Sequence, residues 1–562
     1  MNRRSFALGG VSLVALLGGA AHSAPPPLDL IIYGGPIYTG MDERPQVEAV
    51  AVAGGRIVWT GPMSEIERFV GPDTQRIHLK GAAMYPGFTD AHAHLLGIGQ
   101  RELTLNLEGT PSLAAMLVAV SAWAAAHPTD TVLTGRGWIE THWPEARFPT
   151  RQDLDKAVPD RPLLLRRADG HAVAVNSAAL AAAHITRDTA APSGGEILKD
   201  GAGEPTGMLI DAAQELIGAL LPAESRAEIN RAHTAAFEVY ARYGWTGLHN
   251  MSVSEAEREA LEARQLAGGV PLRVYNAVTP EAAPRLLREG AKFSSDGQLI
   301  TRTIKVYADG ALGSRGAALF EPYSDRPDTR GLMQSTAEQM IPLYEQALRK
   351  GIQCTTHAIG DRGNASVLDW YEAAFKAVPK AQRPVKDPRF RIEHAQILRL
   401  SDIPRFKQLG VIPSMQASHA IGDFYFAPAR LGDARLDGAY AWKRLIEAGA
   451  IIPGGTDAPV ERGDPLIEFY AATARRSLDG FQGPDWRADQ AVDRQTALKM
   501  YTVWPAYASF RENELGQIRP GFRADFTVFS VNLMTAPEAE IPKAHALLTI
   551  VGGKTAYRRE GW

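Results

Sequence analysis

Five short, mostly apolar segments along the chain each carry a residue that can bind a metal ion. In the first, Tyr85–His94, two histidines lie one residue apart, at positions 92 and 94. In an extended strand, residues i and i+2 point to the same side, so both imidazoles can reach one zinc-sized ion at about 2.0–2.1 Å. A surface turn with two histidines is the alternative for this segment. The later segments contribute Lys305, His357, His394 and Asp457, in that order. This series indicates a parallel barrel, in which chemistry sits at the carboxyl ends of the strands.

The order of these residues resembles the pattern of the amidohydrolase superfamily. Three longer motifs are similar to its YtcJ-like branch, amidohydrolase family 3, the group that contains N-substituted formamide deformylase. The motifs are Ile304–Arg315, His357–Asp361 and Glu393–Gln396. The resemblance extends over nearly the whole chain that follows the first residues. It implies an α/β fold with a (β/α)8 TIM barrel, a small β-sandwich built from both chain ends and an inserted cap subdomain.

The expected domain organisation has three parts. We assign 28–82 and 505–562 to the β-sandwich, 83–99 and 226–504 to the metal-dependent hydrolase barrel, and 100–225 to the inserted subdomain. Strand-like runs near both chain ends agree with this assignment, and the pair Gly54-Gly55 predicts a hairpin turn between two of them. Two unrelated β-flaps are the alternative for the end segments.

The barrel segments contain apolar runs that predict the order of the strands. After the His-x-His strand we expect strands two and three at 244–249 and 272–275, and strand seven at 412–416. The strands that carry the remaining candidate ligands are then four (Lys305), five (His357), six (His394) and eight (Asp457). All five segments would therefore meet at one rim of the barrel.

The segment 100–225 predicts a subdomain with its own helices and strands. Thr110-Pro111 predicts a helix start, because threonine caps helices well and proline fits the first turn. Strands are expected at 131–134 and 162–167. In the related family such an insertion covers the barrel mouth, so Trp138 and His171 are expected to contact substrate. Packing inside the insertion is the alternative for both residues.

The resemblance also implies the roles of the candidate ligands. His92, His94 and Asp457 would hold one divalent metal ion, most simply zinc, and His357 and His394 would hold the other. Lys305 would be carboxylated by carbon dioxide and bridge both ions, since an unmodified ammonium has no lone pair to offer. Asp457 is the candidate general base and acid. A salt-bridging lysine and a purely structural aspartate are the alternatives.

Four further charged residues in the motifs are expected around the ligands. Asp309 and Arg315 are candidate substrate contacts, and Asp361 and Glu393 are expected beside the ligands. Arg315 has two interpretations, a partner for a substrate carboxylate or a brace for its own loop. Ordinary loop salt bridges are the alternative for the whole group.

Charge and cysteine content limit the partners. A formal net charge of -3 and a pI near 6.6 provide no basic surface, so neither nucleic acid nor a membrane is expected as a partner. The single cysteine, Cys354, excludes an intramolecular disulfide and is expected to pack in the core. The expected partners are a small-molecule substrate and, as an option, a second copy of the chain.

The first residues resemble a secretory signal. Arg3-Arg4 precede an apolar stretch from Ala7 to Ala21, which predicts a twin-arginine signal peptide over 1–23 and a periplasmic or secreted protein. An uncleaved anchor helix is the alternative, although the run is short and glycine-rich for a membrane span.

These observations lead to one predicted function and two rivals. The predicted function is metal-dependent hydrolysis of a non-peptide C–N bond in an N-substituted amide or formamide. A lactonase or esterase on the same site is the nearest rival. A catalytically inactive periplasmic binding protein is the rival from another class, although a pure binder has no need of a complete ligand set.

Overall fold

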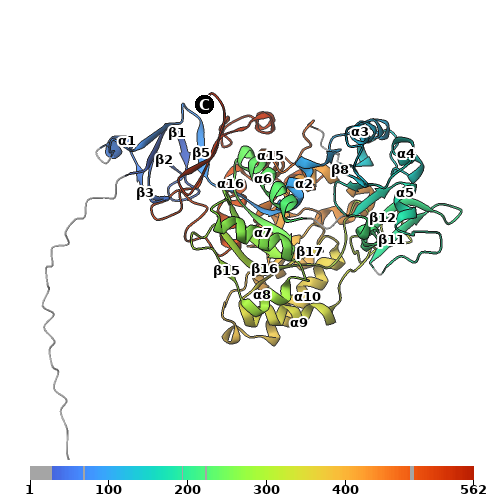
Figure 1. Ribbon diagram of the computed structural model, residues 1–562. Coiled ribbons are helices and arrows are strands. Elements are labelled where there is room, and N and C mark those ends of the chain that lie inside the picture. The colour runs from blue at the N-terminus through green and yellow to red at the C-terminus, as the bar shows by residue number, and fades with distance from the viewer. Residues whose placement is uncertain (1–27, 68–69, 193, 222–224, 481–485) are drawn as a thin grey trace, which may run out of the picture.

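The computed structural model describes residues 28–67, 70–192, 194–221, 225–480 and 486–562. The predicted signal peptide lies outside these residues. Figure 1 shows three bodies, with the barrel between a sheet made of blue and red strands and a teal subdomain. No helix in the described ranges is both long and apolar enough to cross a membrane.

The blue and red strands form one sheet from both ends of the chain. Its order is β23-β22-β21-β5-β1-β2-β3, with β4 paired to β1. The two ends join where Phe526 of β21 pairs antiparallel with Pro86 of β5. The strands are β1 (Leu30–Tyr38), β2 (Gln46–Ala53), β3 (Arg56–Gly61), β4 (Gln75–His78), β5 (Ala83–Pro86), β21 (Phe526–Phe529), β22 (Ala546–Val551) and β23 (Lys554–Arg558), and helix α1 (Met63–Ile66) lies beside them. Strands from both chain ends, which we expected to form a small β-sandwich, thus belong to one continuous hydrogen-bonded sheet.

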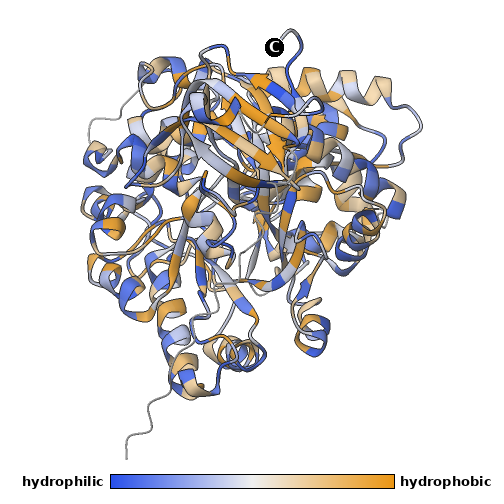
Figure 2. Cartoon of the chain, turned by 90° about the vertical axis from the view of Figure 1, so that its left-hand side faces the viewer, coloured by the Kyte–Doolittle hydropathy of each residue, from blue (hydrophilic) through white to orange (hydrophobic). Residues whose placement is uncertain are grey.

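Apolar residues from both ends fill the core of this sheet. Ile32 and Val50 share one cluster of buried side chains with Val528 and Ile550. Figure 2 shows the strands of the sheets mostly in orange, whereas the helices mix orange and blue. The Gly54-Gly55 turn joins β2 to β3, and both glycines have positive φ (58° and 72°), as a two-residue hairpin of this type requires. The end sheet therefore begins as the sequence predicts.

Eight parallel strands form the barrel, in the order β6-β13-β14-β16-β17-β18-β19-β20. Their bounds are β6 (Phe88–Ala93), β13 (Trp245–Val253), β14 (Arg273–Val278), β16 (Leu299–Tyr307), β17 (Gln353–Ala358), β18 (Arg391–His394), β19 (Ile412–Gln416) and β20 (Gly454–Gly455), and β15 (Lys292–Phe293) pairs with β16. The last strand returns to the first, because Asp457 N donates to His92 O (2.7 Å) and His94 N donates to Ala458 O (2.8 Å). The predicted α/β barrel and its strand order are confirmed.

Helices follow the barrel strands along the chain. They are α2 (Leu95–Leu103), α6 (Arg226–Tyr243), α7 (Glu255–Leu266), α8 (Ala283–Glu289), α9 (Ala337–Lys350), α10 (Asp361–Ala377), α11 (Ile403–Leu409), α12 (Ala417–Asp423), α13 (Ala427–Leu431), α14 (Trp442–Glu447), α15 (Pro465–Ala474), α16 (Arg494–Met500) and α17 (Val503–Ala508). The chain leaves the barrel after α2 and returns through α6. These two helices are in close contact, since a Cβ on Gly99 would lie 1.8 Å from Ala232 O.

The segment between α2 and α6 forms a separate six-stranded sheet with its own cores. Its strands are β7 (Leu105–Asn106), β8 (Leu133–Trp138), β9 (Leu163–Arg167), β10 (Ala172–Val175), β11 (Gly195–Lys199) and β12 (Pro205–Asp211), and its helices are α3 (Leu113–Ala126), α4 (Arg151–Ala157) and α5 (Ser177–Ala182). The turns that follow β8 and β9 line the pocket at the barrel mouth, and Asp211, the last residue of β12, contacts His171 of the second turn. We refer to this body as the insert.

Two local predictions need correction. Ala83–Pro86 belongs to the end sheet and not to the barrel, because these residues pair with β21. Helix α3 begins after Ser112 and not at Thr110-Pro111, since the Ser112 hydroxyl accepts the backbone N–H of Ala115 (3.1 Å). Thr110-Pro111 and Ser112 are all residue types that favour a helix start, but Ser112 is the residue that caps α3. Cys354 is fully buried, as predicted, and burial raises the pKa of its thiol.

Candidate active site

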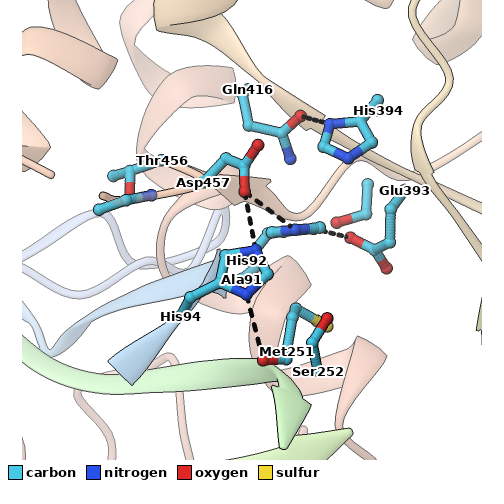
Figure 3. A network of polar contacts seen from close by, with 12 residues as sticks. Ala91, His92, His94, Met251, Ser252, Glu393, His394, Gln416, Thr456 and Asp457 are labelled. Atoms are coloured by element: carbon cyan, nitrogen blue, oxygen red, sulfur yellow. Dashed lines mark hydrogen bonds and ion pairs between the residues drawn. The ribbon is translucent and has the colours of Figure 1, made fainter. Parts of the chain in front are cut away.

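Four of the predicted ligands meet at the carboxyl ends of the barrel strands. His92 and His94 lie at the end of β6, His394 ends β18, and Asp457 follows β20. Asp457 Oδ1 lies 3.1 Å from His94 Nε2 and 3.3 Å from His92 Nε2. Figure 3 shows the two imidazoles on one side of this carboxylate. The His-x-His spacing thus brings both rings to one point, as a strand requires.

Each of the three histidines uses Nδ1 for a hydrogen bond to a protein oxygen, which makes Nε2 the atom that can bind a metal ion. His92 Nδ1 lies 2.5 Å from Glu393 Oε2, His94 Nδ1 lies 3.2 Å from Met251 O, and His394 Nδ1 lies 2.8 Å from Gln416 Oε1 (Figure 3). Each of these oxygens is an acceptor, so the proton of a neutral imidazole sits on Nδ1. The Nε2 atoms then carry lone pairs, which is the tautomer that metal-bound histidines adopt.

The residues present fit a divalent cation. His92 Nε2 is buried and has no hydrogen-bond partner among the described residues, and His419 Nε2 is in the same state. Buried polar nitrogens without partners are costly unless an ion or a ligand satisfies them. Nitrogen from histidine and oxygen from aspartate are the donors that zinc accepts. Two groups of potential ligand atoms, each within 4.8 Å of one another, share Asp457: His92, His94 and Asp457, and His394, His419 and Asp457.

A buried ion pair supports His92 from behind. Glu393 and Arg391 are both fully buried, and Arg391 Nε lies 2.7 Å from Glu393 Oε1. Burial alone would raise the pKa of Glu393, but Arg391 and His92 hold it well below its usual range. Arg391 also donates to Ala91 O (2.7 Å) and to the hydroxyl of Ser414 (2.8 Å). The pair therefore fixes both the ring and the backbone of the first ligand strand.

Lys305 lies on β16 beneath the same mouth. Its side chain is 1% exposed and forms no ion pair or hydrogen bond within the described ranges, and Nζ lies 5.0 Å from the centre of the Tyr307 ring. Burial lowers the pKa of Lys305 to about 8, against the charges of Glu393 and Asp457. A larger fraction of the amine is therefore neutral near pH 7 than in an exposed lysine.

The second group of ligand atoms differs from the expected pair of His357 and His394. The His357 ring packs 4.6 Å from that of His394, centre to centre, but its Nε2 faces Gly310 O at 3.4 Å. This group consists of His394, Asp457 and His419 on α12, and it does not include His357. His419 was not among the ligands predicted from the sequence. A histidine three residues after the strand end at Gln416 was the available signal.

Backbone geometry at the ligands is strained. His394 and Asp457 have φ angles of 73° and 58°, a left-handed conformation that residues other than glycine rarely adopt. Each such residue costs on the order of 1–3 kcal/mol, and such costs concentrate at active sites. This backbone conformation directs both side chains from the strand ends into the barrel mouth.

Two predicted substrate contacts, Trp138 and Asp309, do not line the pocket over the ligands. Trp138 is fully buried in the core of the insert, and its indole N–H donates to Leu165 O (2.8 Å). Asp309 is fully buried, and its carboxylate accepts backbone N–H groups of Ala318, Ile359 and Gly360 at 2.8–2.9 Å. These two predictions are therefore corrected: Trp138 packs, and Asp309 joins the loops after β16 and β17.

The two remaining charged candidates hold loops in place. Arg315 pairs with Asp325 (2.8 Å), so the alternative of a loop brace is the one found. Asp361 accepts the backbone N–H of Phe320 (3.0 Å) at the start of α10. Neither residue lines the pocket over the ligands among the described residues.

His171 is the one candidate contact that reaches the pocket. Its ring packs 5.3 Å from that of His357, and its Nδ1 lies 2.7 Å from Asp211 Oδ1. Burial would lower the pKa of His171, but Asp211 raises it to about 8. The pocket is lined by the insert (Ile139, Arg167, Ala168, Asp169 and His171), by loops of the barrel (Ala311, Leu312, Gly313, Ile359, Gln396, Asp423, Phe426, Val460 and Glu461) and by His357, His394, His419 and Asp457. The insert thus forms one wall of the pocket, and His171 lies in that wall.

A parallel barrel with a histidine and aspartate cluster at the carboxyl ends of its strands defines a class of metal-dependent hydrolases. A comparison with family profiles matches residues 75–557 to the amidohydrolase family. This chain belongs to that family.

Relatives and solved structures agree with this assignment. YtcJ of Bacillus subtilis (strain 168), a provisionally assigned amidohydrolase, is 36% identical over 536 residues, which cover 94% of this chain and 99% of YtcJ. The N-substituted formamide deformylase of Arthrobacter pascens is 27% identical over 569 residues, covering 95% and 99%. The crystal structure of an uncharacterized metal-dependent hydrolase from Pyrococcus horikoshii OT3 superimposes with a TM-score of 0.73 at 26% identity, covering 91% and 99%. The chain is thus a metal-dependent hydrolase of known fold.

Proposed function

We propose that the protein hydrolyses a non-peptide C–N bond in an N-substituted amide or formamide, with water as the nucleophile. The observation that carries this proposal is the convergence of His92 Nε2 and His94 Nε2 on Asp457 Oδ1, at 3.3 and 3.1 Å. The similarity to a formamide deformylase over most of both chains supports the type of bond.

The residues that would hold the metal are those whose donor atoms converge. We assign one ion to His92, His94 and Asp457, and a second to His394 and His419 with His357 beside them. Zinc suits this mixture of nitrogen and oxygen donors. When bound, such ions lower the pKa of a bound water towards 7 and polarise the carbonyl of the substrate.

Asp457 is the proposed carrier of the proton. Burial alone would raise the pKa of Asp457, but the neighbouring imidazoles of His92 and His94 hold it well below its usual range. Its carboxylate is therefore ionised at neutral pH and can accept a proton from the attacking water. Delivery of that proton to the leaving nitrogen lets the product amine depart as a neutral group.

We also propose that Lys305 is carboxylated. The neutral Nζ forms a bond to the carbon of carbon dioxide and loses one proton, which leaves a carbamate with two oxygen donors. Burial favours this reaction, because it raises the fraction of neutral amine. No ion pair within the described residues stabilises the charged form of this buried amine.

We propose that the protein is exported and acts in the periplasm or outside the cell. Arg3-Arg4 and the apolar stretch that follows them support a twin-arginine signal peptide. This route moves folded proteins, which suits an enzyme that acquires its metal before export. Detection of the activity in the periplasmic fraction, and its loss from that fraction in an Arg3→Lys/Arg4→Lys variant, would test the location.

A matched pair of substrates tests the function. N-butylformamide and butyl formate differ only in the atom that leaves, so we expect hydrolysis of the amide by the zinc-loaded protein. Asp457→Asn should lower kcat by about 10²–10⁴-fold, the usual contribution of a general acid–base group. Asp328→Asn, at an exposed carboxylate, is the control and should leave the rate unchanged. Hydrolysis of the ester alone would favour the lactonase or esterase alternative.

A further inference from the structure

The pocket over the ligands has a surplus of carboxylates on its outer walls. Asp169, Asp423 and Glu461 line it, together with a single arginine, Arg167. A cavity of this composition attracts cations and repels anions, because the charges face each other across little water. His419 lines the same cavity, is 8% exposed, and has an unpartnered Nε2. The carboxylates are therefore part of a ligand-binding cavity and not an isolated surface cluster.

The arginine in this wall forms hydrogen bonds with two neighbouring carboxylates. Arg167 is 1% exposed, and its Nε and Nη2 donate to the two carboxylate oxygens of Glu140 at 2.9 and 3.0 Å. Its Nη1 donates to Asp169. Two carboxylates thus outweigh one guanidinium, so Arg167 provides no net positive charge for a substrate carboxylate. Arg315, the other candidate for that role, pairs with Asp325.

Glu461 is the carboxylate without a partner. Its side chain forms no hydrogen bond or ion pair with any residue that the structure describes, and it is part-buried. It lines both the catalytic cavity and an adjoining outer pocket that also contains Glu108, Asp464 and Glu468. Burial first, and then the charges of Glu468, Asp423, Glu108 and Asp457, raise the pKa of Glu461 well above its ordinary value. Arg462 lines the outer pocket as well, but it pairs with Glu108 (3.1 Å), and no basic side chain of the described residues forms an ion pair with Glu461.

Asp423 is held in place without being neutralised. It accepts hydrogen bonds from Gln396 Nε2 (2.9 Å) and from the hydroxyl of Tyr440 (2.5 Å), both uncharged donors. Its orientation is therefore fixed by neutral donors, and because burial raises its pKa to about 7, a neighbouring cation would favour its charged form. Leu312, Phe426 and Val460 line the same cavity, and such apolar surface suits an aliphatic spacer.

We propose that Glu461, assisted by Asp423, forms a cation subsite that selects N-substituted amides whose N-substituent carries a protonated amine. Amides that carry a carboxylate at that position, such as N-acyl amino acids, are excluded by the same wall. This inference rests on the proposed amide hydrolysis and specifies its substrate class. A substrate ammonium group would provide the counterion that Glu461 lacks among the described residues.

Three formamides with the same spacer test the inference. N-(3-aminopropyl)formamide is cationic, N-butylformamide is its neutral isostere, and N-formyl-4-aminobutyrate is anionic. For the zinc-loaded protein we expect kcat/KM to fall in that order, with the cation ahead of the isostere by about tenfold or more, as a hydrogen bond between charged groups provides.

Variants assign the preference to particular side chains. Glu461→Gln should remove most of the advantage of the cation, measured as the ratio of kcat/KM for the cationic amide to kcat/KM for its neutral isostere. Glu447→Gln, an exposed carboxylate on α14, removes the same charge from the surface and should keep the parent ranking. Since Glu461 lacks a partner, Glu461→Gln should also melt at the same or a higher temperature than the parent. A lower melting temperature with an unchanged ranking would show a purely structural role and overturn the inference.

The outcomes separate this inference from the proposed function. Equal kcat/KM for the cationic and neutral amides would refute the subsite while the hydrolysis itself stands. If none of the three amides is hydrolysed, the proposed function fails. Calorimetric binding of the same three compounds to the zinc-loaded parent and Glu461→Gln then decides the inference: the same ranking supports it, and equal affinities for the cation and its isostere overturn it.

Discussion

Replacement of Glu393 by glutamine separates the support of the metal site from the stability of the barrel. Glu393 has two partners, His92 Nδ1 at 2.5 Å and Arg391 Nε at 2.7 Å, and all three side chains are fully buried. Glutamine keeps the shape but removes the charge. Its amide group can serve one partner as an acceptor only if it presents its NH₂ group towards the other.

Two effects of known size follow. Arg391 loses its buried counterion, and breaking such a pair costs about 3–5 kcal/mol of unfolding free energy. If the NH₂ group faces His92 Nδ1, the ring must carry its proton on Nε2, which removes the lone pair that binds metal. Loss of such support lowers metal affinity by about 10–100-fold, or about 1.4–2.7 kcal/mol.

A second buried ion pair provides the control. Arg273 and Asp525 join the barrel to the end sheet at 2.5 Å and are 7% exposed each, far along the chain from the ligands. Asp525→Asn should therefore destabilise the protein to a similar extent, as measured by denaturant unfolding of the metal-free protein. Zinc titration of Asp525→Asn should give the affinity of the parent, whereas Glu393→Gln should bind more weakly.

The reasoning is refuted if Glu393→Gln binds zinc as tightly as the parent does. Equal losses of zinc affinity in both variants would also contradict it, because they would show that the affinity follows global stability. Only a loss of zinc affinity that is confined to Glu393→Gln supports a specific role of Glu393 in positioning His92.

Three further predictions follow from the site. Burial lowers the pKa of Lys305 to about 8 in the folded chain, against about 10.5 when unfolded; between these values the unfolded state binds more protons, so the free energy of unfolding of metal-free, carbonate-free protein should rise from pH 8 to 10.5. Lys305→Met should abolish this rise in denaturant titrations, and a slope that persists would disprove the assignment. His419→Ala should reduce the zinc bound per chain in elemental analysis, and an unchanged content would remove His419 from the ligands. Trp138→Ala should cost about 3–5 kcal/mol in unfolding free energy, because it empties a core position of the insert. The KM of the folded fraction for N-butylformamide should stay the same, and a large rise in KM would restore Trp138 as a substrate contact.

The order of the barrel strands could be predicted because each strand is a short apolar run that ends on a chemically distinctive residue. His92, His94, His394 and Asp457 occupy strand ends, where parallel topology brings them together whatever the loops do. The ligand cluster is therefore encoded locally, in the strands themselves.

Residues outside the barrel strands could not be placed in the same way. Trp138 follows a glycine at the end of β8, and only the packing of the insert decides that it faces the core. His419 reaches the ligands from the first turn of α12, whose direction depends on contacts made elsewhere, such as the bond from Ala417 N to Glu468 (3.0 Å). Loop direction is set by tertiary contacts that a strand pattern does not contain.

The same limit explains Arg315 and Glu461. The sequence left two roles open for Arg315, and its pairing with Asp325, ten residues away, decided between them. Nothing in the sequence marks Glu461, because its significance comes from the partners that it lacks in the folded chain. Missing partners become visible only once all the neighbours are in place.

The central claim is that the cluster of His92, His94 and Asp457 binds the metal that hydrolysis requires. The direct test is zinc titration of the chelator-stripped parent and of a His92→Ala/His94→Ala variant, with hydrolysis of N-butylformamide measured on the same samples. We predict that zinc restores hydrolysis in the parent, and that the variant binds less zinc and stays inactive. Hydrolysis by the stripped parent, or equal zinc binding by both proteins, would contradict the account.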